Sequence, residues 1–152
     1  MIETFNVSSQ GQTLSLKKGL TFKIMFFLLG LFLLLRLPGL SLPYYQDEWK
    51  NVSAAASIQS AGSFFAHPPL MQVMFVVAHK AFGGNYFRLF PLLFALVSAI
   101  LLYLVVKNRI NKKAALWAIA LYATSFYAVL GSLVPDVDGA ILPFFFLLSV
   151  YV

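Results

Sequence analysis

Two short segments carry four of the five acidic residues in this sequence, and both could do chemistry. Asp47 and Glu48 are adjacent, and Asp136 and Asp138 are separated by one residue further along the chain. A carboxylate that is partly shielded from water can have its pKa raised and act as a general base. The D-x-D spacing also suits a divalent cation, because carboxylate oxygens are its preferred ligands. Both pairs have structural alternatives: helix caps or first-turn acids for the first pair, and a helix-ending turn for the second.

Cationic and aromatic residues near the acids are candidates for recognising a phosphate or a sugar. Arg36 and Arg88 flank apolar runs, where arginine either extends to lipid head groups or binds a phosphate with its paired donors. His67 precedes two prolines, a position that suits either a helix cap or a phosphate contact. Tyr45 lies beside the first acid pair, where an aromatic ring serves either a membrane-interface belt or a sugar platform. These four residues are our candidates for substrate binding.

The composition places these candidates in a membrane protein. The chain has 152 residues, of which 61% are hydrophobic and 11% are charged. A soluble domain is nearer half apolar and a quarter charged, so these values exclude a disordered chain, a coiled coil and an ordinary soluble enzyme. The absence of cysteine excludes disulfides, thiol nucleophiles and Cys-ligated zinc. The net charge of +6 indicates loop orientation rather than nucleic-acid binding, because the basic residues lie beside apolar runs.

Four apolar runs predict membrane-spanning helices. They cover about residues 19–37, 87–106, 114–134 and 139–152. The first three match the roughly 20 residues that cross a bilayer. The fourth is still apolar at Val152, so we expect the chain to be the front part of a longer protein or a truncated reading frame. A cleaved signal peptide is the competing explanation of the first run, but residues 37–40 offer no small-x-small cleavage site, which favours an uncleaved anchor.

A further apolar run, residues 69–82, is better explained as a helix that lies on the membrane surface. Its polar residues, among them His79 and Lys80, gather on one face. This pattern is typical of an interfacial helix, and a second one is predicted over residues 48–61. Both belong to a long outer loop, residues 38–86, and a long structured loop at the interface indicates a site. The repeating apolar face of the run consists of Leu70, Met74, Ala78 and Phe82.

The basic residues indicate which side of the membrane each loop faces. If residues 69–82 do not cross, seven of the eleven basic residues flank spans on one side, and the four acids named above lie on the other. The positive-inside rule favours this arrangement. We therefore predict an all-α polytopic membrane protein with about four transmembrane helices, two interfacial helices and a cytoplasmic polar tail at residues 1–18. The seven basic residues are Lys17, Lys18, Lys23, Lys107, Arg109, Lys112 and Lys113.

Three sequence pieces follow one another along the chain: Tyr45-Gln46-Asp47-Glu48-Trp49, then His67-Pro68-Pro69-Leu70 followed by Phe82-Gly83 and Arg88-Leu89, and finally Pro135-Asp136-Val137-Asp138 before Phe144-Phe145-Phe146. In this order and spacing they resemble the membrane glycosyltransferases of the GT-C type. The resemblance is to the protein O-mannosyltransferases and to the bacterial lipid A aminoarabinose transferases. The lysine that follows His-Pro-Pro in the eukaryotic enzymes is replaced here by Met71-Gln72, which favours a bacterial-type relative in the inner membrane.

The resemblance implies transfer of a sugar from a polyprenyl-phosphate donor, with inversion, to a lipid, polysaccharide or protein acceptor at the outer face. Asp47 would be the general base and Glu48 would support it. The resemblance implies no particular cofactor, and a divalent cation held by Asp136 and Asp138 is left as an alternative. The other implied site residues are Asp138, with Asp136 next in order, for building the site, and His67 and Arg88 for meeting the donor phosphate.

The alternative is a non-catalytic membrane subunit or scaffold, in which the acids cap helices and the basic residues only set topology. A transporter is disfavoured, because no predicted span carries a charge at mid-bilayer. Complete enzymes of the GT-C type have many more spans, so we expect no turnover from these 152 residues alone.

Overall fold

The structure is a computed structural model that describes residues 8–56, 69–135 and 137–152. Side chains are described from Gly19 onward within these ranges, except at a few positions that include Asp47 and Val137. The described residues form helices and no strand, so the predicted all-α class is confirmed for them.

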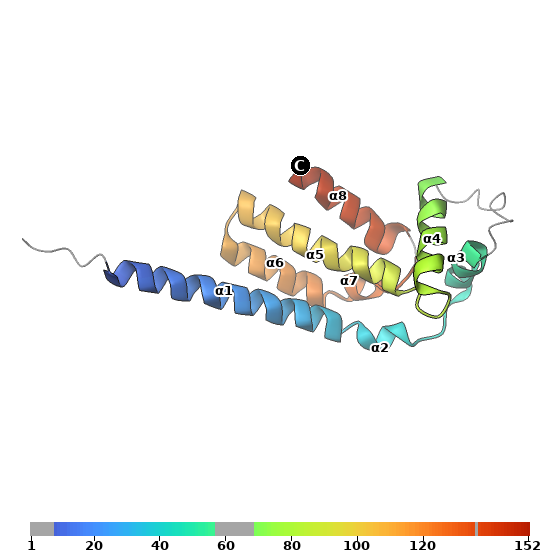
Figure 1. The fold of residues 1–152 in the computed structure, drawn as a ribbon, viewed down its shortest axis with the longest axis horizontal. Coiled ribbons are helices and arrows are strands. Elements are labelled where there is room, and N and C mark those ends of the chain that lie inside the picture. The colour runs from blue at the N-terminus through green and yellow to red at the C-terminus, as the bar shows by residue number, and fades with distance from the viewer. Residues whose placement is uncertain (1–7, 57–68, 136) are drawn as a thin grey trace, which may run out of the picture.

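Four helices lie side by side and give the molecule its long axis (Figure 1). They are α1 (Ser8–Leu34), α5 (Leu89–Arg109), α6 (Lys112–Thr124) and α8 (Leu142–Tyr151). Shorter elements connect them at one end: α2 (Leu37–Leu40), α7 (Phe126–Gly131) and a single π-helical turn, η2 (Val137–Ile141). We call this end, which also bears Glu48 and Asp138, the acidic end. At the opposite end, residues 107–113 form the last turn of α5, the connection to α6 and the first residues of α6. We call this end the basic end.

Two helical segments are long and apolar enough to cross a membrane. They are Gly19–Leu40, with mean hydropathy 2.1, and Leu89–Arg109, with mean hydropathy 2.7. Only 11% of the first is buried in the described protein, which suits a surface in contact with lipid. These segments correspond to the first two predicted spans. The last described apolar helix, Asp138–Tyr151, is shorter.

The predicted third span is not one helix, so four continuous spans are not found among the described residues. The chain breaks at Ser125, whose backbone is extended with φ −62° and ψ 126°. In a continuous helix the carbonyl of Ala123 would accept from the N–H of residue 127. It accepts instead from Nη1 of Arg36, at 3.1 Å. A contact from the first span therefore replaces the local bond and stabilises the break between α6 and α7.

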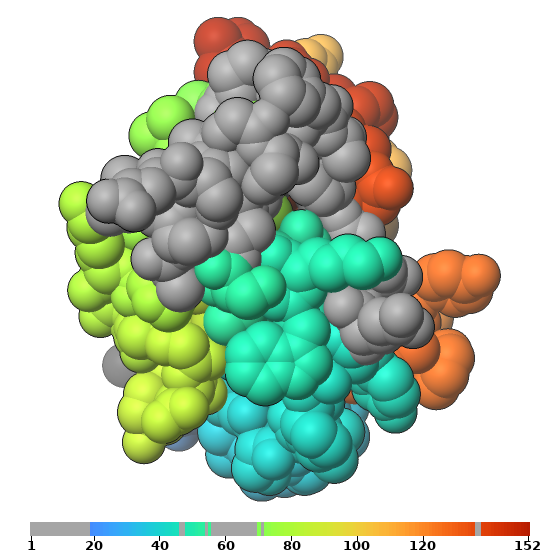
Figure 2. Space-filling view, turned by 90° about the vertical axis from the view of Figure 1, so that its right-hand side faces the viewer, coloured from blue at the N-terminus to red at the C-terminus, as the bar shows by residue number. Residues whose placement is uncertain are grey.

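Helix α4 (Pro69–Phe82) has the predicted bounds and lies across the acidic end, against α3 (Gln46–Ala56) (Figure 1). Figure 2 looks onto this end, where α3 and α4 form much of the surface. Most of the predicted apolar face of α4 contacts protein rather than the outside, because it meets α3 and the start of α5. Ala78 is buried and Met74 and Phe82 pack against the same core, whereas Leu70, Val73 and Val77 are exposed.

Three clusters of buried side chains hold the helices together along the bundle. At the acidic end, α3, α4 and α5 meet through residues such as Val52, Phe75 and Phe90. In the middle, Phe32 of α1 packs against alanines of α5 and α6. Near the basic end, Leu28 of α1 packs against Tyr103 of α5 and residues of α6. Small residues at the contacts allow the helices to approach closely, as is common between membrane helices.

Candidate active site at the acidic end

Glu48 fixes the first turn of α3. Its Oε2 accepts from the backbone N–H of Tyr45 at 2.7 Å, and the N–H of Trp49 donates to the carbonyl of Tyr45 at 2.9 Å. Tyr45 is thus the residue before the helix, and Glu48 reaches back from the third helical position, as in one half of a capping box. Asp47 lies in this same fixed turn, one residue earlier. The sequence offered a capping role for Asp47 and Glu48, and in the structure Glu48 makes the capping bond.

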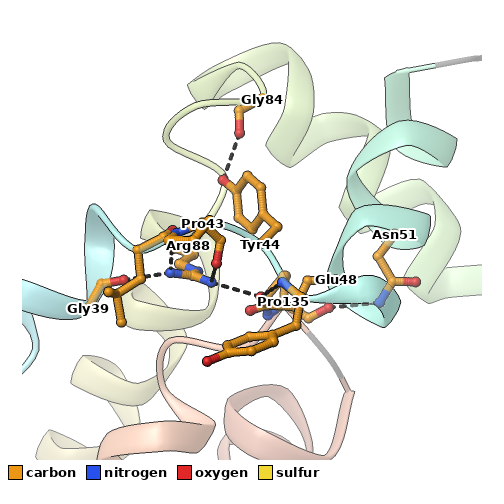
Figure 3. Close-up of polar contacts among 10 residues, drawn as sticks. Gly39, Pro43, Tyr44, Glu48, Asn51, Gly84, Arg88 and Pro135 are labelled. Carbon is orange, nitrogen blue, oxygen red and sulfur yellow. Dashed lines mark hydrogen bonds and ion pairs between the residues drawn. The ribbon is translucent and has the colours of Figure 1, made fainter.

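Arg88 binds the same carboxylate from the start of α5 (Figure 3). Its Nη2 lies 2.7 Å from Oε2 of Glu48, and both side chains are buried. The other bonds of the guanidinium go to backbone carbonyls at the end of the first candidate span and just after it. Nη1 donates to the carbonyls of Gly39 at 2.6 Å and Leu42 at 2.8 Å, and Nη2 donates to that of Pro43 at 3.0 Å. Arg88 therefore joins three segments: the end of the first span, the start of α3 and the start of α5.

Tyr44 closes this cluster. Its hydroxyl donates to the carbonyl of Gly84 at 2.6 Å, and the guanidinium carbon of Arg88 lies 4.9 Å from the centre of its ring. Burial raises the pKa of the Tyr44 phenol above its usual value, although a backbone hydrogen bond and the charge of Arg88 oppose the shift. The phenol is thus held neutral, and its hydrogen bond joins the segment just before α3 to the turn after α4.

Asn51 brings the second acidic segment to the first. Its side-chain amide is buried and donates to the carbonyl of Pro135 at 3.0 Å (Figure 3). The segment after Pro135 leads into η2, which carries Asp138. The two acid-bearing segments therefore lie at the same end of the bundle, although which face of the membrane this is stays a prediction. No role for Asn51 was predicted from the sequence. A signal for one was present, because this polar residue shares a helical face with the apolar Ala55.

Asp138 opens onto a cavity of about 560 Å³ between α6, α7, η2 and α8. Its side chain is exposed, and the rest of the cavity wall is largely apolar, with polar groups from Tyr122, Ser125 and Tyr127. Gly131 and Gly139 touch across this region: a Cβ added to Gly131 would lie 2.9 Å from the Cα of Gly139. Only glycine fits this approach of α7 to η2, so the pair fixes the turn that presents Asp138.

Arg36 does not extend to lipid head groups. It is fully buried, and its Nε donates to the hydroxyl of Ser132 at 2.7 Å. Its Nη1 donates to the carbonyls of Phe32 at 2.8 Å and Ala123 at 3.1 Å, and its guanidinium carbon lies 3.6 Å from the centre of the Phe32 ring. Nη2 has no hydrogen-bond partner in the described part of the chain. In this structure Arg36 ties α1 to α6 and to the turn before the second acidic segment.

A second cavity, of about 400 Å³, adjoins Arg88 where the first span meets α5. Among the described residues, Arg88 is the one charged residue that lines it, and Nε of this arginine has no partner there. The other lining residues are Leu37, Leu40, Ser41, Asn85, Tyr86 and Leu89. The charge of Arg88 is paired with Glu48, but its unpaired Nε is a donor for an anionic group that carries an apolar chain into this mostly apolar cavity.

The remaining predicted residues are not brought into this cluster by the described structure. Tyr45 is 76% exposed and contributes its backbone N–H rather than its ring. His67 and Asp136 lie outside the described residues, and so does the side chain of Asp47. Within the described ranges, no three His, Asp or Glu side chains gather closely enough to hold a metal ion. The roles assigned to all these residues stay predictions.

Comparison with known families decides the class of the protein. The family model described as dolichyl-phosphate-mannose-protein mannosyltransferase matches residues 66–152, more than half of the chain. The chain belongs to this mannosyltransferase family. The predicted GT-C resemblance is thereby confirmed. The matched region of this mannosyltransferase-family chain contains Arg88 and the helices from α4 to α8. It begins after α3, so Asp47 and Glu48 lie outside it. No curated protein and no solved structure matches the chain.

Proposed function

We propose that this chain forms the N-terminal membrane part of a glycosyltransferase that moves a sugar from a polyprenyl-phosphate donor to an acceptor hydroxyl. Family membership supports the transferase class. The observation that carries the assignment to this site is the ion pair between Glu48 and Arg88. It couples the acid pair of α3, which lies outside the matched region, to an arginine inside that region.

The ion pair also suggests how the two adjacent acids divide their work. Oε2 of Glu48 already accepts from the Tyr45 N–H and from Arg88, so this acid acts as the positioning residue. Asp47 is then the base. It takes the proton of the acceptor hydroxyl as the oxygen attacks the anomeric carbon. The bond from that carbon to the phosphate oxygen breaks, the polyprenyl phosphate leaves with the electron pair, and the configuration inverts.

The phosphate of the donor is assigned to the cavity beside Arg88. A guanidinium is a strong phosphate ligand, and its Nε is the donor that is still unpaired among the described residues. The leucines of the cavity wall would accompany the first isoprene units of the donor. Asp138 is proposed to help build the sugar or acceptor site across the acidic end, with Asp136 as the second candidate for this role. His67 is proposed as a further contact of the donor phosphate. Arg36 is reassigned from a substrate ligand to a positioning residue.

The experiment is Asp47→Asn in the membrane enzyme that contains this chain, assayed for sugar transfer from a polyprenyl-phosphate donor. Loss of a general base is expected to lower kcat by about 100-fold or more, with protein levels unchanged. Asp47→Glu is the matched control, because it keeps a carboxylate in the first helical turn and is expected to retain part of the activity. Transfer at the normal rate by the asparagine variant would remove the base and refute the mechanism.

The same variant tests the non-catalytic alternative. That alternative is favoured by one observation: the contacts of Glu48 are fully explained as a helix cap and an ion pair. A scaffold predicts that Asp47→Asn alters only stability, by about 0.3–1 kcal/mol, through the helix dipole.

Orientation is part of the proposal and is tested separately. The sequence has no native cysteine, so single cysteines at positions 47, 113 and 138 each report the side of the membrane on which they lie. We expect a membrane-impermeant thiol reagent added outside intact cells to label positions 47 and 138 but not 113. Labelling of 47 and 138 from opposite faces would separate the two acid pairs and exclude a common site.

A further inference from the structure

A third cavity lies at the basic end, far along the bundle from the acidic end. It has a volume of about 250 Å³ and lies between the start of the first candidate span and the end of the second. Its lining joins the side of α1 to the α5–α6 connection, at the ends of the two candidate spans, which is where a membrane boundary is expected. The lining residues are Thr21, Phe22, Met25, Tyr103, Lys107 and Lys112.

The charge around this cavity is positive, and no acidic counterion to it occurs among the residues that the structure describes. Lys107 and Lys112 line it, and Lys23, Arg109 and Lys113 lie close in sequence to its lining residues. Four of the five acids of the chain are in the two acidic segments at the other end, and the fifth lies outside the described residues. No ion pair of these cations occurs within the described ranges.

Two local features add to this positive potential. Lys112 and Lys113 occupy the first turn of α6, where the partial positive charge of the helix terminus adds to theirs. The ammonium nitrogen of Lys107 lies 5.9 Å from the centre of the Tyr103 ring, so this side chain is drawn toward the cavity wall. Cations that only set topology need to be near the ends of spans, but they do not need to line a cavity.

The apolar part of the wall indicates what kind of anion fits. Phe22 is 58% exposed, and Phe26, one turn further along the span, is also 58% exposed and lies 4.7 Å from it between ring centres. These rings continue from the cavity along the lipid-facing side of α1. A small soluble anion would gain nothing from this surface, whereas an acyl chain would be buried against it.

We propose that the cavity at the basic end binds the phosphate head group of an anionic phospholipid, with Lys107 and Lys112 as its ligands and an acyl chain lying along Phe22 and Phe26. Basic pockets between membrane helices are suited to such head groups. This site is separate from the proposed transferase site, and neither depends on the other.

The test is native mass spectrometry of the chain released from detergent, titrated with phosphatidylglycerol and, separately, with phosphatidylcholine. We expect phosphatidylglycerol to bind more tightly. The double variant Lys107→Gln/Lys112→Gln is expected to weaken its binding roughly 10- to 30-fold, from about 1 kcal/mol per lysine. The matched control Arg109→Gln/Lys113→Gln removes the same charge from the same connection but leaves the cavity lining intact, and it is expected to bind within about threefold of the original chain.

Three outcomes would overturn the proposal: equal weakening by the two double variants, equal affinity for the two lipids, or displacement of the lipid by inorganic phosphate at the same concentration. The first would reduce the effect to general attraction of a basic surface, and the last would assign the cavity to a free anion. If the double variant fails to fold, Lys107→Gln and Lys112→Gln are measured singly, and each is expected to weaken binding about fivefold.

Discussion

The acidic and basic ends of the bundle treat their cations in opposite ways. At the acidic end, Arg36 and Arg88 are buried and their guanidinium groups are used on carbonyls, a hydroxyl and one carboxylate. At the basic end, Lys112 and Arg109 are exposed, and no acid lies near them in the described structure. Internal bonding at the acidic end holds the segments of the protein together and leaves Nε of Arg88 for the proposed donor phosphate. At the basic end, the cations have no acidic partner among the described residues and are available for the proposed lipid. The type of a residue does not reveal this difference, but its partners do.

The largest expected effect tests the internal bonding. Arg88→Met leaves Glu48 buried without a counterion and removes the partner of three carbonyls, so we expect a loss of about 3–5 kcal/mol in the free energy of unfolding. The measurement is denaturant unfolding of the chain in detergent. Lys107→Met is the control at the basic end, and its effect is expected to stay within about 0.5 kcal/mol. Equal effects of the two variants would abolish the contrast between the ends.

Close backbone packing sharpens the same contrast at an intermediate scale. Gly139→Ala places a Cβ against the backbone of Gly131, so we expect a loss of about 1–3 kcal/mol. Gly30→Ala is the matched control, because a Cβ there meets nothing within 4 Å and alanine favours the helix by about 0.5–1 kcal/mol. Thermal unfolding of both variants gives the comparison. A stable Gly139 variant would mean that α7 and η2 can separate without cost.

Signals in the local sequence were sufficient to predict the helices whose ends are set by residues at those ends. Helix α4 has its predicted bounds because Pro69 suits a first turn and because Gly83, with φ +68°, ends the helix in a conformation that glycine adopts freely. Helix α5 follows from an uninterrupted apolar run. The predicted helix after residue 48 begins at Gln46, two residues earlier, because Glu48 caps it from inside.

Contacts between distant segments could not be predicted, and these contacts build the candidate site. Glu48 meets Arg88 across 40 positions, and Arg36 meets Ser132 across 96. An arginine at the end of a span has the same local pattern whether it extends to lipid or turns inward. The break at Ser125 has the same origin, because the carbonyl that a continuous helix would use is taken by Arg36. One sequence signal was available, a polar Asn51 on an apolar face.

A smaller effect is expected from the neutral donor of the cluster. Tyr44→Phe removes the bond to the Gly84 carbonyl and is expected to cost about 0.5–1.5 kcal/mol at neutral pH. Because the folded state raises the pKa of this phenol, the unfolded chain releases the proton near pH 10.0 while the folded chain still holds it. The contribution of Tyr44 to the free energy of unfolding is therefore complete below pH 10.0. It is lost as the pH rises from there through the higher pKa of the folded chain. Melting curves up to about pH 11 should fall less steeply for the variant; parallel curves would contradict the shift.

The smallest effect is expected where the cations are exposed. Arg109→Gln/Lys113→Gln removes two like charges from the connection between α5 and α6, both on side chains that the structure leaves in contact with solvent. Repulsion among exposed charges is weak and is screened by salt, so we expect a change below about 0.5 kcal/mol in the free energy of unfolding. Any change should be a gain at low salt that disappears at high salt, measured by denaturant unfolding in detergent. A salt-independent loss would instead reveal an internal partner for these cations, and the basic end would then resemble the acidic one.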